Sequence, residues 1–247
     1  MEINLWELWG HMGLPVRVVV IALSLQAMAC VAVVLDRLVV LKQSADRARD
    51  FAALAGPAME AGNYPQVLAS ISEVKSNHLT QYLDLGLRLF LNRLNVGDKV
   101  ERAVECARRG LTRKGDAISR DLNRGMNVLA STGSTAPFVG LLGTVLGIIN
   151  AFKLIAESGS GGIGTIGGAI GESLVVTGYG LIVAIPSVLV FNWLSGKIAN
   201  YEAGLLNAGS ELLDRLEFEV QAPQQQSAPV APSSRPVPRP SPPVAAR

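Results

Sequence analysis

Cysteine, aromatic residues and charge are all scarce in this chain of 247 residues. The two cysteines lie far apart, one in an apolar run and one in a charged stretch, so the sequence offers neither a disulfide framework nor a paired-cysteine metal site. The net charge of +2 is too small to indicate a nucleic-acid partner. Because the sequence also has no nucleophile elbow, phosphate loop or HExxH motif, we expect neither an enzyme nor a cofactor.

Apolar residues, in contrast, make up 49% of the chain and gather in three blocks. Each block is long enough to cross a bilayer as a helix, which takes about 20 residues. The pattern predicts an all-α membrane protein with three transmembrane helices, at residues 16–41, 126–152 and 169–194. A cleaved signal peptide is the alternative for the first block, but the basic residues that should precede it are missing.

Lysine and arginine predict the orientation of these spans. Residues 1–16 contain neither, the predicted loop at 153–168 contains only Lys153, and residues 42–125 contain fourteen. Since cytoplasmic loops carry the excess of basic residues, we expect a periplasmic N-terminus, a short periplasmic loop at 153–168 and a cytoplasmic C-terminus.

The remaining segments have different compositions. Residues 1–15, with Trp6 and Trp9, suit an interfacial segment, and residues 42–125 predict a cytoplasmic helical domain. The third span is predicted to continue as a cytoplasmic helical extension at 195–220. Residues 221–247 hold eight of the thirteen prolines and predict a disordered tail.

Within the cytoplasmic domain we expect helix breaks at Gly56-Pro57 and at residues 62–65. Asp98 is placed to cap a helix that meets no proline until Pro137 and could therefore run from cytoplasm into membrane, although Gly110, Gly115 and Gly125 weaken it. His11 and His78 have no metal ligands at a suitable spacing, and we expect both to be ordinary surface histidines.

Small residues recur at spacings of four and three along the second and third spans. The two stripes are Gly133, Pro137, Gly140, Thr144, Gly147 and Ala151, and Ser173, Thr177, Gly180, Ala184 and Ser187. In one interpretation these stripes, together with Gly143, let helix backbones pack closely, and each threonine only bonds its own or a neighbouring helix. In the other they face a lumen, where Thr144, Thr177 and Ser173 supply sparse polar points for a proton or an inserted helix.

Glu172 and Pro186 are the other unusual residues of the third span. A carboxyl group in an apolar setting favours its neutral form, so Glu172 could bind and release protons; the alternative is a solvated carboxylate at the start of the helix. Pro186 removes one backbone donor, which predicts either a hinge or a static kink.

The segments APFVGLLGTVLGIINAF (136–152) and GESLVVTGYGLIVAIP (171–186) resemble the proton-channel family of MotA, TolQ and ExbB, in its three-span TolQ and ExbB branch. The resemblance implies that Thr144 and Thr177 line a pore, that Glu172 is the family's buried glutamate and that Pro186 is the proline of its AIP motif. Tyr179 is bulkier than the residue usual at this point of the family's pattern.

The resemblance further implies an all-α, ring-forming assembly in the bacterial inner membrane. Five copies would enclose two single-span helices of an ExbD- or TolR-like partner that carries a transmembrane aspartate. The expected function is a stator and proton-channel subunit that couples the proton motive force to TonB-type uptake, Tol-Pal envelope maintenance or gliding motility. A structural membrane scaffold without ion conduction is the competing hypothesis.

Overall fold

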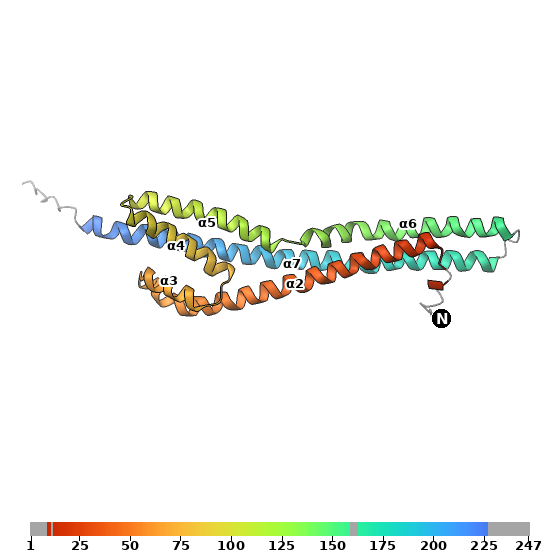
Figure 1. Cartoon of the computed structure of the whole chain (residues 1–247), viewed down its shortest axis with the longest axis horizontal. Coiled ribbons are helices and arrows are strands. Elements are labelled where there is room, and N and C mark those ends of the chain that lie inside the picture. Colours follow the sequence, from red (N-terminus) through yellow and green to blue (C-terminus); the bar gives the residue numbers. More distant parts are fainter. Residues whose placement is uncertain (1–8, 11, 159–162, 227–247) are drawn as a thin grey trace, which may run out of the picture.

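A computed structural model describes residues 9–10, 12–158 and 163–226, which form a long, narrow bundle of helices (Figure 1). Trp6, His11 and residues 227–247 of the predicted tail lie outside the described residues. The helices are α2 (Leu14–Glu60), α3 (Tyr64–Glu73), α4 (His78–Asn95), α5 (Val100–Leu122), α6 (Met126–Ser158) and α7 (Ile163–Gln226).

The three longest helices, α2, α6 and α7, carry the apolar spans. Leu14–Glu60, Met126–Lys153 and Gly167–Phe218 each contain an 18-residue stretch that is long and apolar enough to cross a membrane. This confirms the predicted all-α membrane protein with three spanning helices and long helical extensions. The chain is a multi-pass membrane protein.

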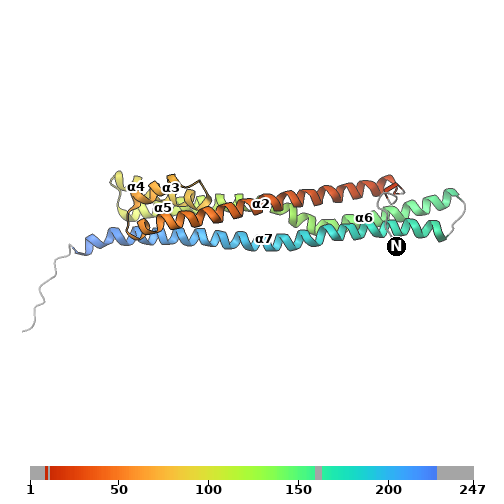
Figure 2. The same cartoon turned by 90° about the horizontal axis from the view of Figure 1, so that it is seen from below.

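The bundle has two ends with different neighbours. At one end α6 and the first part of α7 form an antiparallel pair, called the membrane hairpin below, and the first part of α2 packs against it (Figures 1 and 2). At the other end α3, α4 and α5 join the last parts of α2 and α7 in what we call the distal bundle.

Each end has its own apolar core. In the distal bundle Leu87 and Phe90 of α4 are fully buried together with Leu212 and Leu216 of α7. The core of the membrane hairpin is smaller and includes Leu23 of α2, Ala136 and Val176. Leucine and aromatic side chains are therefore frequent in the distal core, whereas the core at the membrane end is mainly valine and alanine.

The helix ends agree with the sequence prediction at residues 62–65 and differ from it at Gly56-Pro57. Helix α2 ends at Glu60, and Gly62 follows with a φ of 68° that favours glycine. The helix continues through Pro57, however. Because Phe51, Ala55 and Ala58 are buried in the distal core, tertiary packing holds this last turn helical despite the proline.

The predicted helix from Asp98 into the membrane was also wrong. Lys99, rather than Asp98, is the N-cap residue of α5, and the Asp98 carboxylate instead accepts a 3.4 Å hydrogen bond from Arg93. Helix α5 ends at Leu122 and α6 begins at Met126. Gly125, with a φ of 80°, makes this break because its backbone turns where other residues are strained.

Helix also extends into the segment predicted as a short loop at 153–168. Helix α6 reaches Ser158 and α7 starts at Ile163, so Gly164 and Gly167 are helical. Glycine lowers helix stability by about 1 kcal/mol per residue without forbidding a helix. The glycine-rich composition therefore led to a predicted loop that is longer than the one in the structure.

Candidate functional site

The membrane hairpin brings the two small-residue stripes face to face. An ideal Cβ at Gly140 would lie 3.2 Å from the Cα of Thr177 and 3.3 Å from the Cα of Gly180. Gly147 faces Ser173 in the same way, and Gly133 faces Val188. The stripes therefore run antiparallel to one another along most of the hairpin.

Several positions in this contact have room only for glycine. A Cβ at Gly180 would lie 2.7 Å from the carbonyl oxygen of Ala136, and one at Gly143 would lie 2.5 Å from Cγ1 of Val176. At Gly147 the added carbon would overlap Oγ of Ser173. In lipid, where apolar burial gives helices no net drive to associate, such close packing is what holds two helices together.

The hydroxyl groups of the stripes all donate to backbone carbonyl oxygens. Thr177 Oγ1 donates across the interface to Gly140 at 3.0 Å, whereas Thr144 Oγ1 donates to Leu141 at 2.7 Å within its own helix. Ser173 Oγ donates to Ala169 at 2.8 Å. Each hydroxyl oxygen keeps lone pairs that can accept a hydrogen bond. Within one chain, each of these hydroxyl groups thus bonds its own helix or the neighbouring one, as expected if the stripes serve only for helix packing.

Glu172 lies inside α7 rather than at its start. The helix begins at Ile163, about two and a half turns earlier. Because the field of a helix end falls off within the first turn, the helix-start alternative for this carboxyl group is wrong. Glu172 is half-buried and adjoins Ser173, which is buried against Gly147.

Pro186 lies within α7, which continues as one helix on both sides of it (Figure 2). Its side chain is exposed within the single chain. It lines an apolar groove of 390 Å³ between α2 and α7, together with Cys30, Tyr179 and Ser187. The proline thus faces α2 rather than the contact between α6 and α7.

Polar contacts between α2 and α7 were missed by the sequence analysis. Ser24 Oγ lies 3.0 Å from the Tyr179 hydroxyl, and Ser187 Oγ lies 3.5 Å from the sulfur of Cys30. Ser24 gives its hydrogen to the Val20 carbonyl at 2.8 Å, so Tyr179 is the donor between the two hydroxyls. The available signal was the presence of serine and tyrosine within apolar spans.

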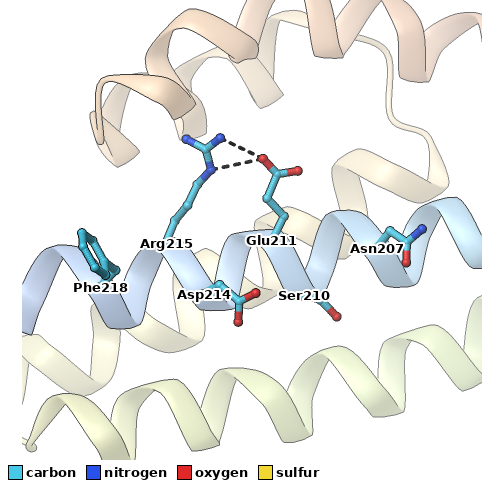
Figure 3. Close-up of a pocket in the computed structure, with 6 residues that line it drawn as sticks. All are labelled: Asn207, Ser210, Glu211, Asp214, Arg215 and Phe218. Atoms are coloured by element: carbon cyan, nitrogen blue, oxygen red, sulfur yellow. Dashed lines mark hydrogen bonds and ion pairs between the residues drawn. The ribbon is translucent and has the colours of Figure 1, made fainter.

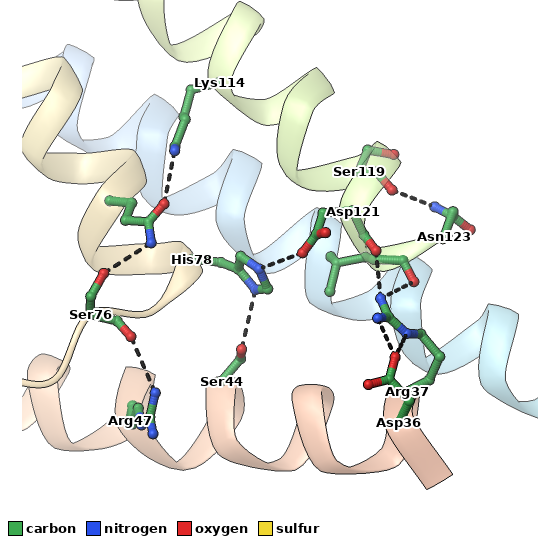
Figure 4. Close-up of polar contacts among 12 residues, drawn as sticks. Asp36, Arg37, Ser44, Arg47, Ser76, His78, Lys114, Ser119, Asp121 and Asn123 are labelled. Atoms are coloured by element: carbon green, nitrogen blue, oxygen red, sulfur yellow. Dashed lines mark hydrogen bonds and ion pairs between the residues drawn. The ribbon is translucent and has the colours of Figure 1, made fainter. Parts of the chain in front are cut away.

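A second polar cluster lies where α2, α4 and α5 meet, next to the membrane spans (Figure 4). Arg37 is buried, pairs with the neighbouring Asp36 and donates to the carbonyl oxygens of Asp121 and Leu122. His78 lies 3.2 Å from Ser44 and 3.5 Å from Asp121. The expectation of a surface histidine was therefore wrong, because 85% of this side chain is covered once α2 and α5 pack against α4.

The far end of α7 carries an open polar cavity of 680 Å³ (Figure 3). Glu211 and Arg215 point to one side of the helix and form an ion pair at 2.8 Å, while Ser210 and Asp214 point to the other. This cavity holds no nucleophile paired with a base. Across the described ranges, no group of three or more His, Cys, Asp or Glu side chains is placed to hold a metal ion.

Comparison with known proteins relates this sequence to a family of proton channels. The sequence model of the MotA/TolQ/ExbB proton channel family matches residues 74–205, which include α4, α5, α6 and the membrane part of α7. That range holds both stripes, Glu172 and Pro186, and of the polar cluster it holds His78 and Asp121 but not the α2 residues Arg37 and Ser44.

Individual relatives match over shorter segments. The chain is 46% identical over 102 residues to the biopolymer transport protein ExbB of Xanthomonas campestris pv. campestris, covering 41% of this chain and 38% of the relative. It is 53% identical over 78 residues to ExbB of Neisseria gonorrhoeae, covering 32% and 36%. It is 42% identical over 97 residues to ExbB of Pseudomonas putida, covering 39% and 30%. The chain thus matches about a third of the length of these relatives.

Proposed function

The chain belongs to the MotA/TolQ/ExbB proton channel family, and from this premise we propose that it is the stator and channel subunit of a TolQ/ExbB-type motor in a bacterial inner membrane. Protons move down the proton motive force along the membrane hairpin. A single-span ExbD- or TolR-like partner with a transmembrane aspartate turns this flow into mechanical work. The match of the family to the hairpin and its polar residues carries the proposal.

Thr144, Thr177, Ser173 and Glu172 are the groups assigned to the proton route. The threonine oxygens keep acceptor lone pairs after donating to backbone carbonyls. Glu172 is the ionisable residue of the hairpin that lies beside these hydroxyls, and ionisable groups at membrane depth mark ion pathways. One proton crossing 100 mV releases about 2.3 kcal/mol, so a few protons suffice for a conformational step.

The proposed assembly is a ring of five copies around two partner helices, and the exposed apolar surface of one chain supports its contact with lipid, other copies or partners. Only 17%, 33% and 28% of the most apolar windows of α2, α6 and α7 are buried within one chain. Large side chains such as Phe138, Ile182 and Leu189 point away from the hairpin. Lipid and neighbouring copies cover such surfaces in a membrane.

The orientation that we propose places the distal bundle in the cytoplasm and the N-terminus in the periplasm. All the helices of the basic segment 42–125 gather at the end of the bundle remote from the turn between α6 and α7 (Figure 1). A single cytoplasmic unit accounts for that arrangement together with the excess of lysine and arginine. The work driven is TonB-type uptake, Tol-Pal envelope maintenance or gliding motility.

A structural scaffold is the second candidate, favoured by one observation. Because Thr144 and Thr177 donate to backbone carbonyls within the same chain, the hydroxyls have a packing role that needs no proton. The two functions make opposite predictions for proton flux through the unmodified assembly.

The test uses the assembly purified with its native partners and reconstituted in vesicles that contain a pH-sensitive dye. Under an imposed voltage, the double variant Thr144→Ala with Thr177→Ala should lose proton entry while the assembly keeps its size. The matched control is Thr135→Ala, since Thr135 also donates to a backbone carbonyl of α6 but lies half a turn around the helix from Thr144 and is exposed. Undiminished proton entry in the double variant would remove both hydroxyls from the proton route, whereas no proton entry even in the unmodified assembly would favour the scaffold.

A further inference from the structure

His78 lies in a polar junction that joins the membrane helices to the distal bundle. We define the polar junction as Arg37 and Ser44 of α2, His78 of α4 and Asp121 of α5 (Figure 4), together with Tyr201 of α7. These residues are far apart in the sequence and meet at the point where α5 ends and the chain turns into α6. The proposed proton route does not use any of them.

The position of His78 is set by the start of α4. Asn77 caps the helix by accepting a hydrogen bond from the Thr80 amide at 2.9 Å, and the Thr80 hydroxyl accepts one from the Asn77 amide at 3.0 Å. His78 is therefore the first residue of a well-capped helix. Its ring contacts Tyr201 edge-on, with 6.0 Å between ring centroids.

The neighbours of the ring define which nitrogen carries hydrogen in the neutral form. The Asp121 carboxylate, 3.5 Å from Nε2, can only accept, so Nε2 carries the hydrogen. Nδ1 then accepts from the Ser44 hydroxyl at 3.2 Å. A protonated ring has two donors, which would force Ser44 to accept and to turn its own hydrogen toward another group.

Most of the surroundings oppose a positive charge on this ring. Burial lowers the pKa of His78 below its ordinary value of 6.5, and the cations Lys114 and Arg37 lower it further. Asp121 acts in the other direction. Because the Asp121 side chain is 54% exposed, water weakens this single favourable ion pair.

The same junction holds the break between α5 and α6. Arg37 donates to the last carbonyl oxygens of α5, at Asp121 and Leu122, where a cation is favoured by the helix dipole. Gly125, at the break itself, lies against α2, since an added Cβ would be 3.2 Å from the side chain of Val33. The contacts of α2 with Asp121 and Gly125 therefore connect the membrane spans to the distal bundle.

We propose that His78 is a pH-sensitive switch: as the pH at the distal bundle falls, the ring gains a proton, leaves its contacts with Ser44 and Tyr201 for water, and loosens the break between α5 and α6. We call the junction closed when the neutral His78 ring contacts Ser44 and Tyr201, and open when the ring is hydrated. His78 binds a proton less readily in the closed state than in the open state. Acid consequently favours the open state, beginning near pH 6.5 and below.

For the proposed motor this switch is a feedback device. If the distal bundle is cytoplasmic, protons that have passed through the membrane accumulate on the side where His78 titrates. A loosened break would transmit less force between hairpin and distal bundle. The feedback rests on the proposed function, whereas the opening of the junction is a property of the chain itself.

The test is amide hydrogen exchange of residues 121–126 in the full-length assembly in lipid nanodiscs, compared at about pH 7.5 and about pH 5.5 after correction for intrinsic exchange rates. We expect exchange to be about fivefold faster in acid, the ratio that about 1 kcal/mol of opening free energy produces. His78→Gln, which cannot be charged, should remove this pH dependence. His11→Gln, which changes the other histidine of the chain, should retain it.

A second measurement needs no variant at His78. In the His11→Gln chain the remaining imidazole signal belongs to His78, and its NMR titration should have a midpoint below 6.5. A midpoint above that value, or the same pH-dependent exchange in His78→Gln, would overturn the switch. Neither measurement involves proton flux, so a failed switch and a failed channel are distinguishable.

Discussion

The hydroxyl of Thr177 donates a 3.0 Å hydrogen bond to the carbonyl oxygen of Gly140 on the opposite helix. The bond depends on the glycine, because a Cβ at residue 140 would lie 3.2 Å from the Cα of Thr177. The same two residues thus allow the helices to pack closely and place a hydroxyl group within the membrane hairpin. Substitutions can separate the effect of the hydroxyl from the effect of the close packing.

Thr177→Val keeps the shape of the side chain and removes its hydrogen bond. We expect a stability loss of about 0.6 kcal/mol, the average for such bonds between membrane helices, together with a large loss of proton flux if Thr177 lies on the route. Thr177→Ser, which restores the hydroxyl, should recover flux. Equal flux in both variants would remove Thr177 from the proton route.

Glycine positions in α7 should differ sharply in their tolerance of alanine. At Gly180 the new Cβ would approach the Ala136 carbonyl oxygen to 2.7 Å, so Gly180→Ala must push the helices apart and should cost about 1–3 kcal/mol. Gly178 has no such neighbour within 4 Å in the described structure. Gly178→Ala should therefore be neutral or stabilising by up to about 1 kcal/mol. Unfolding of the two variants in detergent gives the comparison.

The contact of Tyr179 with Ser24 should stabilise the packing of α2 on α7. Tyr179→Phe removes the donor and Ser24→Ala removes the acceptor of this 3.0 Å bond. A double-mutant cycle should show a coupling of about 0.6 kcal/mol in the free energy of unfolding. Proton flux should be unchanged, because neither residue belongs to the proposed route. A coupling near zero would show that the bond contributes nothing in lipid.

Arg37 should contribute more to stability than the exposed arginines do. Arg37→Met leaves two carbonyl oxygens at the end of α5 without their charged donor and should cost about 1.5–3 kcal/mol. Arg37→Lys keeps the charge but not the guanidinium fork, so an intermediate loss is expected. The control is Arg88→Met, since Arg88 forms an exposed ion pair with Asp84 and should cost less than about 1 kcal/mol. Similar losses at the two sites would contradict the structural role of Arg37.

The three spans and the two stripes were predictable because they depend on local pattern. Uninterrupted apolar length predicts a membrane helix, and spacings of four and three place residues such as Gly140 and Thr144 on one face. What a stripe faces is not a local property. The pairing of Gly140 with Thr177 and Gly180 depends on a hairpin register that the residue types alone do not define.

Helix ends and the polar junction were harder to predict for a related reason. Pro57 stays helical because side chains around it are buried in the distal core, and Gly125 breaks a run that contains no proline. His78 is covered only because α2 and α5, remote in sequence, meet at the start of α4. At Pro57 and His78 tertiary contact outweighed local preference, whereas the break at Gly125 uses the backbone freedom of glycine.

The most direct test of the proton route is an electron cryo-microscopy map of the native assembly with its partners. The account predicts a ring in which Thr144 and Thr177 border a central space occupied by partner helices, with Glu172 beside it. A map with both hydroxyls facing lipid or solid packing between copies, and with no chain in the centre, would contradict it.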